Sequence, residues 1–521
     1  MHHLVATLLV FGLLVASDDK PISRIKVSKG TTYFSGPITK DGLIDYATAI
    51  NHRKKGQSTS ASNSNVLFWK AIGSKPSGRS VAIDSGLFKL MGMTPPSQEG
   101  KYFQGLAMYM DREGTAKSPG PEKRRLQKQA RKQLALAQLQ PWRNREQPLV
   151  AAWLKSNSDA LDLVVLGTAR PSYYSPLFVP QRPGDLIANS LVSVELPGVQ
   201  ALRDCARALL ARSMWHLGER RLQASRADLL ACHRLGRLVG QGPTMLDVLI
   251  GHSIEEMAIR GELVFLQDGR VKKEDIAEVR KNLELLPPMA RCVVAVDLAE
   301  RSMFLDAVQR LANGEAAAME NLFGPVGKQL AEATKKSVDG VDWETVMSIG
   351  NGWYNRAVTA QREPVRKQRQ AGLRKISREL KKMADEIRRR SKTGPLPKTK
   401  KAVSEFVAHL LVTLMFPASL KVQEAEDKHR QRFGNLEVAV ALAGYQRDRG
   451  KYPASVDQLV PKYLEHVRRD SFSGRPLTYR KTTSGYVLYS VGPNGKDDQG
   501  RTADFEPGAD DISIRVPVTV K

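Results

Sequence analysis

The spacing of apolar residues between Glu195 and Leu266 is the feature that most restricts the fold. In its first part, small and apolar side chains recur at intervals of three and four residues, at Leu202, Ala206, Leu209, Leu210, Ser213 and Leu217. That spacing places them on one face of an α-helix. After Gly218, residues 222–239 repeat the pattern. Two adjacent amphipathic helices bury their apolar faces against one another, so we expect a helical hairpin.

This hairpin resembles a single tetratricopeptide-type unit. The resemblance is carried by Trp215, Leu217, Gly218, Ala227 and Ala231. A repeat array would show the period again. The chain does not repeat it strictly, although helical patterns continue at 245–266 and 276–286. The resemblance implies a helical scaffold over residues 121–340 that binds partners and performs no chemistry.

The first 17 residues have the features of a signal peptide. Leu4–Ala16 is an apolar run of 13 residues, shorter than the about 20 that a helix needs to cross a bilayer. Val15 and Ser17 are small enough for a signal peptidase site. We therefore expect cleavage after Ser17 and export to the periplasm, the cell surface or the medium. His2 and His3 replace the usual basic residues, so an uncleaved membrane anchor and a misassigned start are alternatives.

Composition divides the rest of the chain into further regions. Residues 18–120 are rich in Gly, Ser and Pro and predict an irregular N-terminal region. Residues 341–401 are highly charged, with a narrow apolar seam at Ile376, Leu380, Met383 and Ile387. This seam predicts one extended helix from Trp343 to Arg390, packed on one side and followed by a linker. Residues 402–521 have the pattern of an α+β module.

The formal net charge of +26 is concentrated in two places. Residues 362–401 contain 16 basic and four acidic residues, and a smaller basic cluster lies between 123 and 132. Such fields attract polyanions in a salt-dependent way. For an exported chain these are anionic lipid, acidic polysaccharide or extracellular DNA, and the predicted contacts are Arg388, Arg389, Arg390 and Lys392. Solvated faces of long helices are the alternative interpretation.

Three cysteines, an odd number, exclude a complete disulfide framework. Cys205, Cys232 and Cys292 all lie in apolar helical patterns, where a free cysteine behaves as a small core hydrophobe. We therefore expect three buried thiols. A single bridge between Cys205 and Cys232 is the alternative in an oxidising compartment.

The C-terminal region changes from helical to alternating patterns. From Leu414 onwards the chain reads as a long helix, which Gly450 and Pro453 terminate, and then as a short helix at 457–464. Residues 476–479, 485–491 and 511–516 each alternate apolar and polar side chains. They predict three antiparallel strands.

This order of elements resembles the bacterial pseudopilins and type IV pilin-like proteins of secretion systems, over about a fifth of the chain. The resemblance is carried by Pro417-Ala418, Asn435-Leu436, Ala441-Leu442, Tyr445, Gly450, Tyr452-Pro453, Leu459, Asp470, Gly474, Tyr479, Gly485-Tyr486 and residues 488–492. No prepilin peptidase motif precedes Phe406–Leu420, the place of the apolar pilin helix. Pilus assembly by the usual route is therefore not expected. The whole chain looks like one of the large uncharacterised exported bacterial proteins that end in such a module.

In the major pseudopilins of type II secretion, the loop that follows the corresponding strand holds calcium. The resemblance implies a calcium site in the loop 492–504, with oxygen donors from Ser490, Asn494, Asp497, Asp498 and Asp504. Carboxylate and carbonyl oxygens are the ligands that Ca²⁺ takes in proteins. An acidic, solvated turn is the alternative interpretation.

The sequence has no Walker A, dinucleotide-binding, HExxH, GxSxG or CxxC motif. His252, Glu255 and Glu256 share one helical segment and resemble half of a bundle metal site, but no second copy occurs and packing is the expected role. We expect a mainly α body with a C-terminal α+β module. The expected function is a non-catalytic envelope scaffold with a protein partner and no small-molecule cofactor. An exported hydrolase without a motif and a polyanion-binding surface protein are alternatives.

Overall fold

The structure, a computed structural model, describes residues 25–114, 119–179, 190–313, 340–393, 399–503 and 506–518. The expected signal peptide and Asp504 lie outside these residues. The described part is mainly helical, with one three-stranded antiparallel sheet near the C-terminus. The expectation of a mainly α chain with a small C-terminal sheet is thereby confirmed. No helix of the described part is both long enough and apolar enough to cross a membrane.

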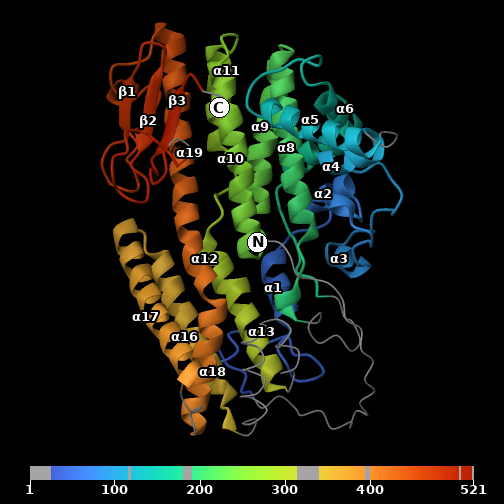
Figure 1. The fold of residues 1–521 in the computed structure, drawn as a ribbon, viewed down its shortest axis with the longest axis vertical. Coiled ribbons are helices and arrows are strands. Elements are labelled where there is room, and N and C mark those ends of the chain that lie inside the picture. The colour runs from blue at the N-terminus through green and yellow to red at the C-terminus, as the bar shows by residue number, and fades with distance from the viewer. Residues whose placement is uncertain are drawn as a thin grey trace.

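The expected helical hairpin lies at the centre of the molecule (Figure 1). It consists of α8 (Pro197–Gly218) and α9 (Leu222–Val239), and α10 (Met245–Gln267) packs against both. The α9 and α10 backbones approach closely because Gly236 and Gly251 face each other. A Cβ at position 251 would stand 2.6 Å from the Gly236 carbonyl oxygen. Next along the chain is α11 (Lys273–Glu284).

Helices that precede the hairpin in the chain cover one side of it (Figure 1). The region expected to be irregular contains α1 (Tyr46–Lys55), which packs in the core of the lower helices, α2 (Ser64–Ile72), α3 (Ser85–Leu90) and α4 (Leu106–Tyr109). The region expected to be helical begins with α5 (Gly120–Ala137), α6 (Pro148–Ser156) and α7 (Ser158–Thr168). The α2 helix joins α7 and α8 and buries Phe68 and Trp69 in the core that it shares with them.

A second group of helices forms the lower half of the molecule in Figure 1. It comprises α12 (Cys292–Ala295), α13 (Arg301–Ala312), α16 (Trp343–Arg362), α17 (Arg366–Thr393) and α18 (Lys400–Met415). The expectation of one helix from Trp343 to Arg390 was wrong. Pro364 lies between α16 and α17, and a proline cannot continue a helix because it lacks the amide hydrogen and its ring clashes with the preceding turn.

The longest helix, α19 (Pro417–Arg449), runs beside α10 and connects the two halves (Figure 1). Pro417 begins it, since the first helical position needs no amide donor. Gly450 ends it with φ 71°, a left-handed conformation that glycine adopts without strain. This terminus was expected, whereas the helix predicted at 457–464 is only a 3₁₀ turn at Val456–Leu459.

The sheet has the order β1 (Thr478–Lys481), β2 (Tyr486–Ser490), β3 (Ile512–Val516), and all pairs are antiparallel. All three strands were expected from their alternating pattern. In the register, Leu488 of the fully buried central strand lies opposite Tyr479 and Ile514. The sheet packs on α19 through β2 and β3.

The α19 helix contributes to each of the three hydrophobic cores. Leu436 and Val440 belong to the core of the hairpin, Val422 to that of the lower helices, and Leu442 to that of the sheet. The three cysteines are buried free thiols, as expected, so the alternative bridge between Cys205 and Cys232 is not formed.

Candidate cation site and buried ionic cluster

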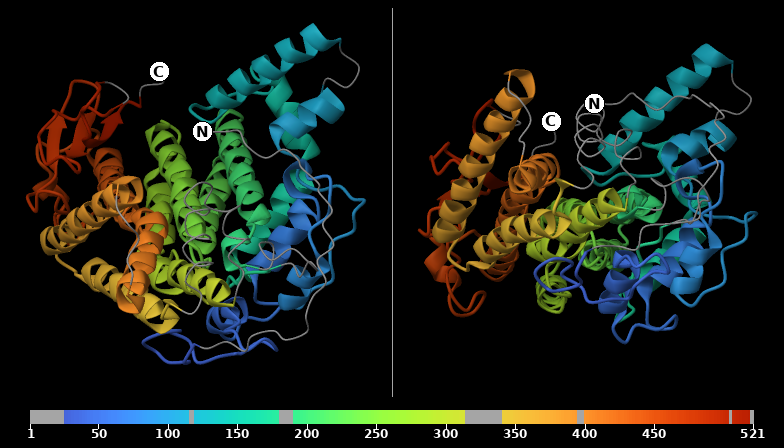
Figure 2. Two further views of the ribbon diagram at one scale, coloured as in Figure 1. Left: turned by 60° about the horizontal axis from the view of Figure 1, so that its bottom comes forward. Right: turned by 90° about the horizontal axis from the view of Figure 1, so that it is seen from below.

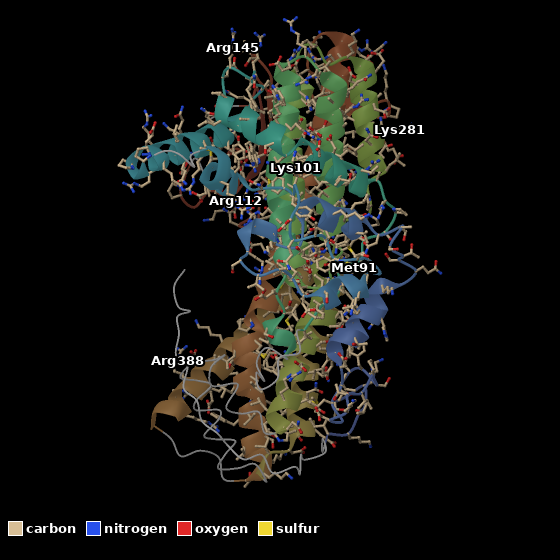
Figure 3. The ribbon with its side chains drawn as sticks, turned by 90° about the vertical axis from the view of Figure 1, so that its right-hand side faces the viewer. Met91, Lys101, Arg112, Arg145, Lys281 and Arg388 are labelled. Carbon is tan, nitrogen blue, oxygen red and sulfur yellow. The ribbon has the colours of Figure 1, made fainter. Side chains whose placement is uncertain are left out.

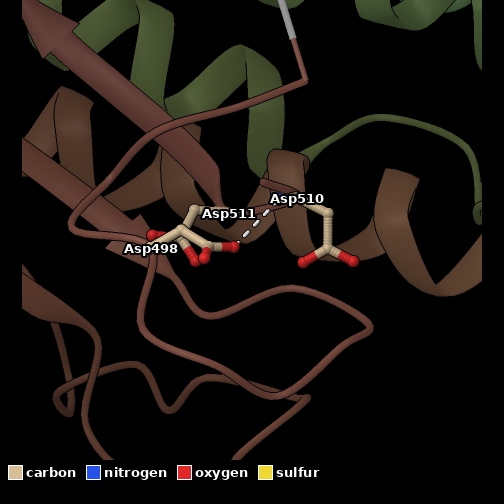
Figure 4. Close-up of side chains that lie close together, drawn as sticks. All are labelled: Asp498, Asp510 and Asp511. Atoms are coloured by element: carbon tan, nitrogen blue, oxygen red, sulfur yellow. Dashed lines mark hydrogen bonds between the residues drawn. The ribbon is translucent and has the colours of Figure 1, made fainter. Parts of the chain in front are cut away.

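The long loop between β2 and β3 brings three carboxylates together (Figure 4). Asp498 lies within the loop, and Asp510 and Asp511 directly precede β3. One oxygen from each carboxylate lies within 4.8 Å of the others. Among the described residues, this is the one group of three or more His, Cys, Asp or Glu side chains with such geometry.

Two of these carboxylates keep an oxygen without any donor. The Asp511 side chain is only 2% exposed, and its Oδ2 accepts a hydrogen bond from the Gly500 amide at 2.6 Å. Asp510 Oδ2 accepts one from the Asn494 amide at 3.0 Å. Oδ1 of both residues is buried and unpaired. A buried anionic oxygen without a partner costs free energy, which a bound cation would offset.

The hydrogen bonds around the third carboxylate organise the loop. Asp498 Oδ2 accepts from the Asp510 amide and from Asn494 Nδ2, both at 3.1 Å. These bonds lower the pKa of Asp498, whereas burial raises the pKa values of Asp510 and Asp511. The loop needs Gly492 at φ 65°, since a Cβ there would stand 2.1 Å from the Asp510 carbonyl oxygen.

The residues that the sequence predicted as ligands are only partly brought together. Asp498 belongs to the cluster, and Asn494 supports it through its amide groups. Ser490 instead donates to Asp470 at 2.6 Å. Asp497 accepts from the Tyr489 hydroxyl at 2.9 Å and from the Gln499 amide. Asp504 lies outside the described residues.

Sequence reasoning missed Asp510 and Asp511. The available signal was two adjacent acidic residues at the start of the strand predicted over 511–516, on the far side of the same loop. Three carboxylates without a histidine or cysteine form a hard-oxygen set, which suits Ca²⁺ better than a softer transition metal. Loop carbonyls and water would supply the remaining ligands.

A second charged group is fully buried between α9, α10 and α19. At its centre, Glu255 of α10 accepts from Arg237 Nε of α9 at 2.6 Å and contacts His429 Nε2 of α19 at 2.7 Å. His252 stacks on His429, with ring centroids 4.4 Å apart. We call these residues, with His233 and Glu262, the buried ionic cluster. Each is at most 6% exposed, so none can touch a substrate in this conformation.

The charges of the buried ionic cluster are internally compensated. Burial would raise the pKa of Glu255, but hydrogen bonding and the charges of His429 and Arg237 lower it below its usual range. Burial lowers the pKa of His252 to about 4 and also lowers that of His233. Burial raises the pKa of Glu262 to about 8. At neutral pH, His252, His233 and Glu262 are therefore uncharged beside the ion pair of Glu255 and Arg237.

This arrangement argues against a metal bound by His252, Glu255 and Glu256. Both Glu255 oxygens are engaged by Arg237 and His429, while Glu256 pairs with Arg432 on the outer side of α19. The His252 Nε2 atom lies 3.2 Å from the Ala290 carbonyl oxygen. The histidine is a packed core residue, as expected.

The basic residues predicted to bind polyanions lie at the projecting end of α17, where Figure 3 labels Arg388. Arg388 pairs with Asp385 at 3.4 Å. Arg389 and Arg390 both pair with Glu386, at 2.8 and 2.9 Å. Lys392 has a side chain outside the described part. The three arginines are therefore partly neutralised by their own helix.

Comparisons with known proteins give no relative for this chain. No protein family, curated protein or solved structure matches it.

Proposed function

We propose that this chain is an exported, non-catalytic scaffold of the cell envelope that binds a protein partner. Its body would act as a tetratricopeptide-like helical platform. Its C-terminal, pseudopilin-like module would be held rigidly on that platform and tied by a calcium ion at Asp498, Asp510 and Asp511. The observation that carries the proposal is that α19 is shared by all three hydrophobic cores.

A shared helix makes the module part of the body. The α19 helix packs along α10 and α11 on one side and carries the sheet on another. The buried ionic cluster fixes its register on α10, because sliding α19 by one turn would separate His429 from Glu255 and leave a buried charge with one partner fewer. Such a rigid body suits a protein that positions a partner.

The calcium part of the proposal rests on the unpaired oxygens of Asp510 and Asp511. Calcium binding to the folded state alone would stabilise the protein by about 2.7 kcal/mol at a concentration one hundred times the dissociation constant. We expect a rise in melting temperature with calcium, measured by calorimetry. In Asp510→Asn/Asp511→Asn the rise should be lost.

Asp497→Asn is the matched control, since Asp497 is exposed, lies in the same loop and is not in the cluster. It should respond to calcium as the parent protein does. If all three proteins respond equally, or if none responds, the loop does not tie the module through calcium.

Cell fractionation with intact-mass measurement tests the envelope location. We expect the product outside the cytoplasm, with the mass of a chain whose first residue is Asp18. A full-length chain in the cytoplasm would contradict export. Turnover of a glycan or peptide panel by the purified protein would contradict the non-catalytic role.

A further inference from the structure

The outer face of α17 carries a stripe of positive charge whose members form no ion pair among the described residues. The helix lies at the edge of the molecule in both views of Figure 2. It packs on α16, α18 and α19, and its buried residues are Leu373, Ile376, Leu380 and Ile387. The opposite face carries exposed cations that form no hydrogen bond or ion pair with any described residue: Lys367, Arg374, Lys375, Arg378, Lys381 and Lys382. We call this set the basic stripe.

The remaining charges near the stripe are already engaged. Arg366 and Arg369 bind Asp427 of α19, at 3.2 and 2.8 Å. Glu379, the one acidic residue within the stripe's length, pairs with Arg356 of α16. No described acid on α17 forms an ion pair with the stripe, which extends over about 22 Å at 1.5 Å per residue. The basic stripe is therefore distinct from the paired arginines at the end of the helix.

A groove with an apolar floor adjoins the stripe. It lies between α17 and α19 and has a volume of about 500 Å³. Its lining includes the apolar Leu373, Leu420 and Ala425, and also Glu424, whose carboxylate pairs with Lys428 at 2.8 Å. The unpaired Arg374 stands at this groove beside the exposed Ser377. A free guanidinium next to an apolar floor is the arrangement that suits an anionic amphiphile.

We propose that the basic stripe and its groove bind anionic phospholipid, so that α17 lies against a membrane surface with a lipid phosphate at Arg374. The groove favours lipid over nucleic acid, since a nucleic acid phosphate carries no apolar chain to cover Leu373 and Leu420. The large exposed apolar residues of the described part also include no aromatic side chain on which bases could stack. Lysines predominate in the stripe, as is typical of electrostatic contact with mobile headgroups.

This inference goes beyond the proposed scaffold role, because it names a surface against which the scaffold is held. It does not depend on the calcium site. The first experiment is co-sedimentation of the full chain with vesicles of phosphatidylcholine, alone or in equimolar mixture with phosphatidylglycerol. We expect binding to the mixed vesicles alone, and we expect added salt to weaken it.

Two triple variants that remove the same charge locate the contact. Lys375→Gln/Arg378→Gln/Lys382→Gln should lower the affinity for mixed vesicles about 100-fold, from the usual contribution of each basic residue near an anionic surface. The control Arg388→Gln/Arg389→Gln/Arg390→Gln should change it less than about threefold, since these arginines are already paired. Equal losses in the two variants would overturn the proposal.

The groove is tested separately with one added carboxylate. Ser377→Glu places a negative charge in the groove, whereas Gln368→Glu places it at an exposed α17 position that does not line the groove. We expect weaker vesicle binding in the first variant only. Retention on duplex DNA without vesicle binding would identify a nucleic acid partner and overturn the lipid assignment. Full competition by inorganic phosphate would show that the site takes free phosphate instead of lipid.

Discussion

The buried ionic cluster and the loop between β2 and β3 each contain a carboxylate that is almost fully inaccessible to solvent. The two carboxylates differ in how many of their oxygens have a partner. Glu255 is surrounded by Arg237 and His429, so both of its oxygens have partners. Asp511 has one oxygen bonded to the Gly500 amide and one with no donor. Both oxygens of Glu255 are occupied by contacts that link α10 to α9 and α19. The Asp511 carboxylate keeps one oxygen without a hydrogen-bond donor, so that oxygen is available to bind a cation.

The largest expected effect comes from breaking the compensated carboxylate. Glu255→Gln keeps the size of the side chain but leaves Arg237 buried without its counter-charge. We expect the free energy of unfolding to fall by about 3–5 kcal/mol, measured by urea denaturation.

The adjacent Glu256→Gln is the control for that change. Glu256 pairs with Arg432 at a site where its side chain is 33% exposed, so the loss should stay below about 1 kcal/mol. If the two variants lose the same stability, the buried ionic cluster does not hold α19 in place.

A smaller effect should appear as a pH dependence from Glu262. Its pKa in the folded protein is about 8, above the value of an unfolded glutamate. The stability that the protonated group contributes is therefore complete below the unfolded pKa and is lost as pH rises through 8. Glu262→Gln should exceed the parent protein in stability by about 3 kcal/mol above that pH. Urea midpoints at about pH 5 and about pH 9 bracket the range over which the stability is lost, and parallel pH profiles of the two proteins would contradict the prediction.

The smallest effect is expected from Asp511→Asn without calcium. Its amide oxygen can still accept from Gly500, and its Nδ2 donor can face the unpaired oxygen of Asp510. We expect unfolding free energy to stay constant or rise by about 1 kcal/mol, the opposite sign to Glu255→Gln. A loss of several kcal/mol on calorimetry would show that Asp511 is compensated in the calcium-free protein too.

The helices and strands could largely be predicted from the sequence because their signals are local. The hairpin followed from periodicity, and the end of α19 followed from Gly450 and Pro453. Pro364 also signals a helix break in the sequence, but the continuous run of charged residues favoured the interpretation as one long helix. The pairing of Arg388 with Asp385 could also have been anticipated, because residues three apart on a helix are neighbours.

The sites could be predicted only in part, because most of their partners are distant in the sequence. His429 and Glu255 are separated by 174 positions, and nothing in either segment specifies the other. Their pairing depends on α19 returning to lie beside α10. The group of Asp498, Asp510 and Asp511 was hard to predict for the same reason, although the separation in sequence is shorter. Asp498 and Asp510 come together only when the loop folds back onto the start of β3.

The position of α19 in the chain also sets the order in which the molecule can mature. Synthesis must pass residue 417 before any of α19 exists, and until then the faces of α10 and of the hairpin core that receive it are exposed. Contacts between segments so far apart form slowly, because a long loop must close first. Much of the body would therefore leave the ribosome before its core is complete, and the core would close only after α19 has been synthesised.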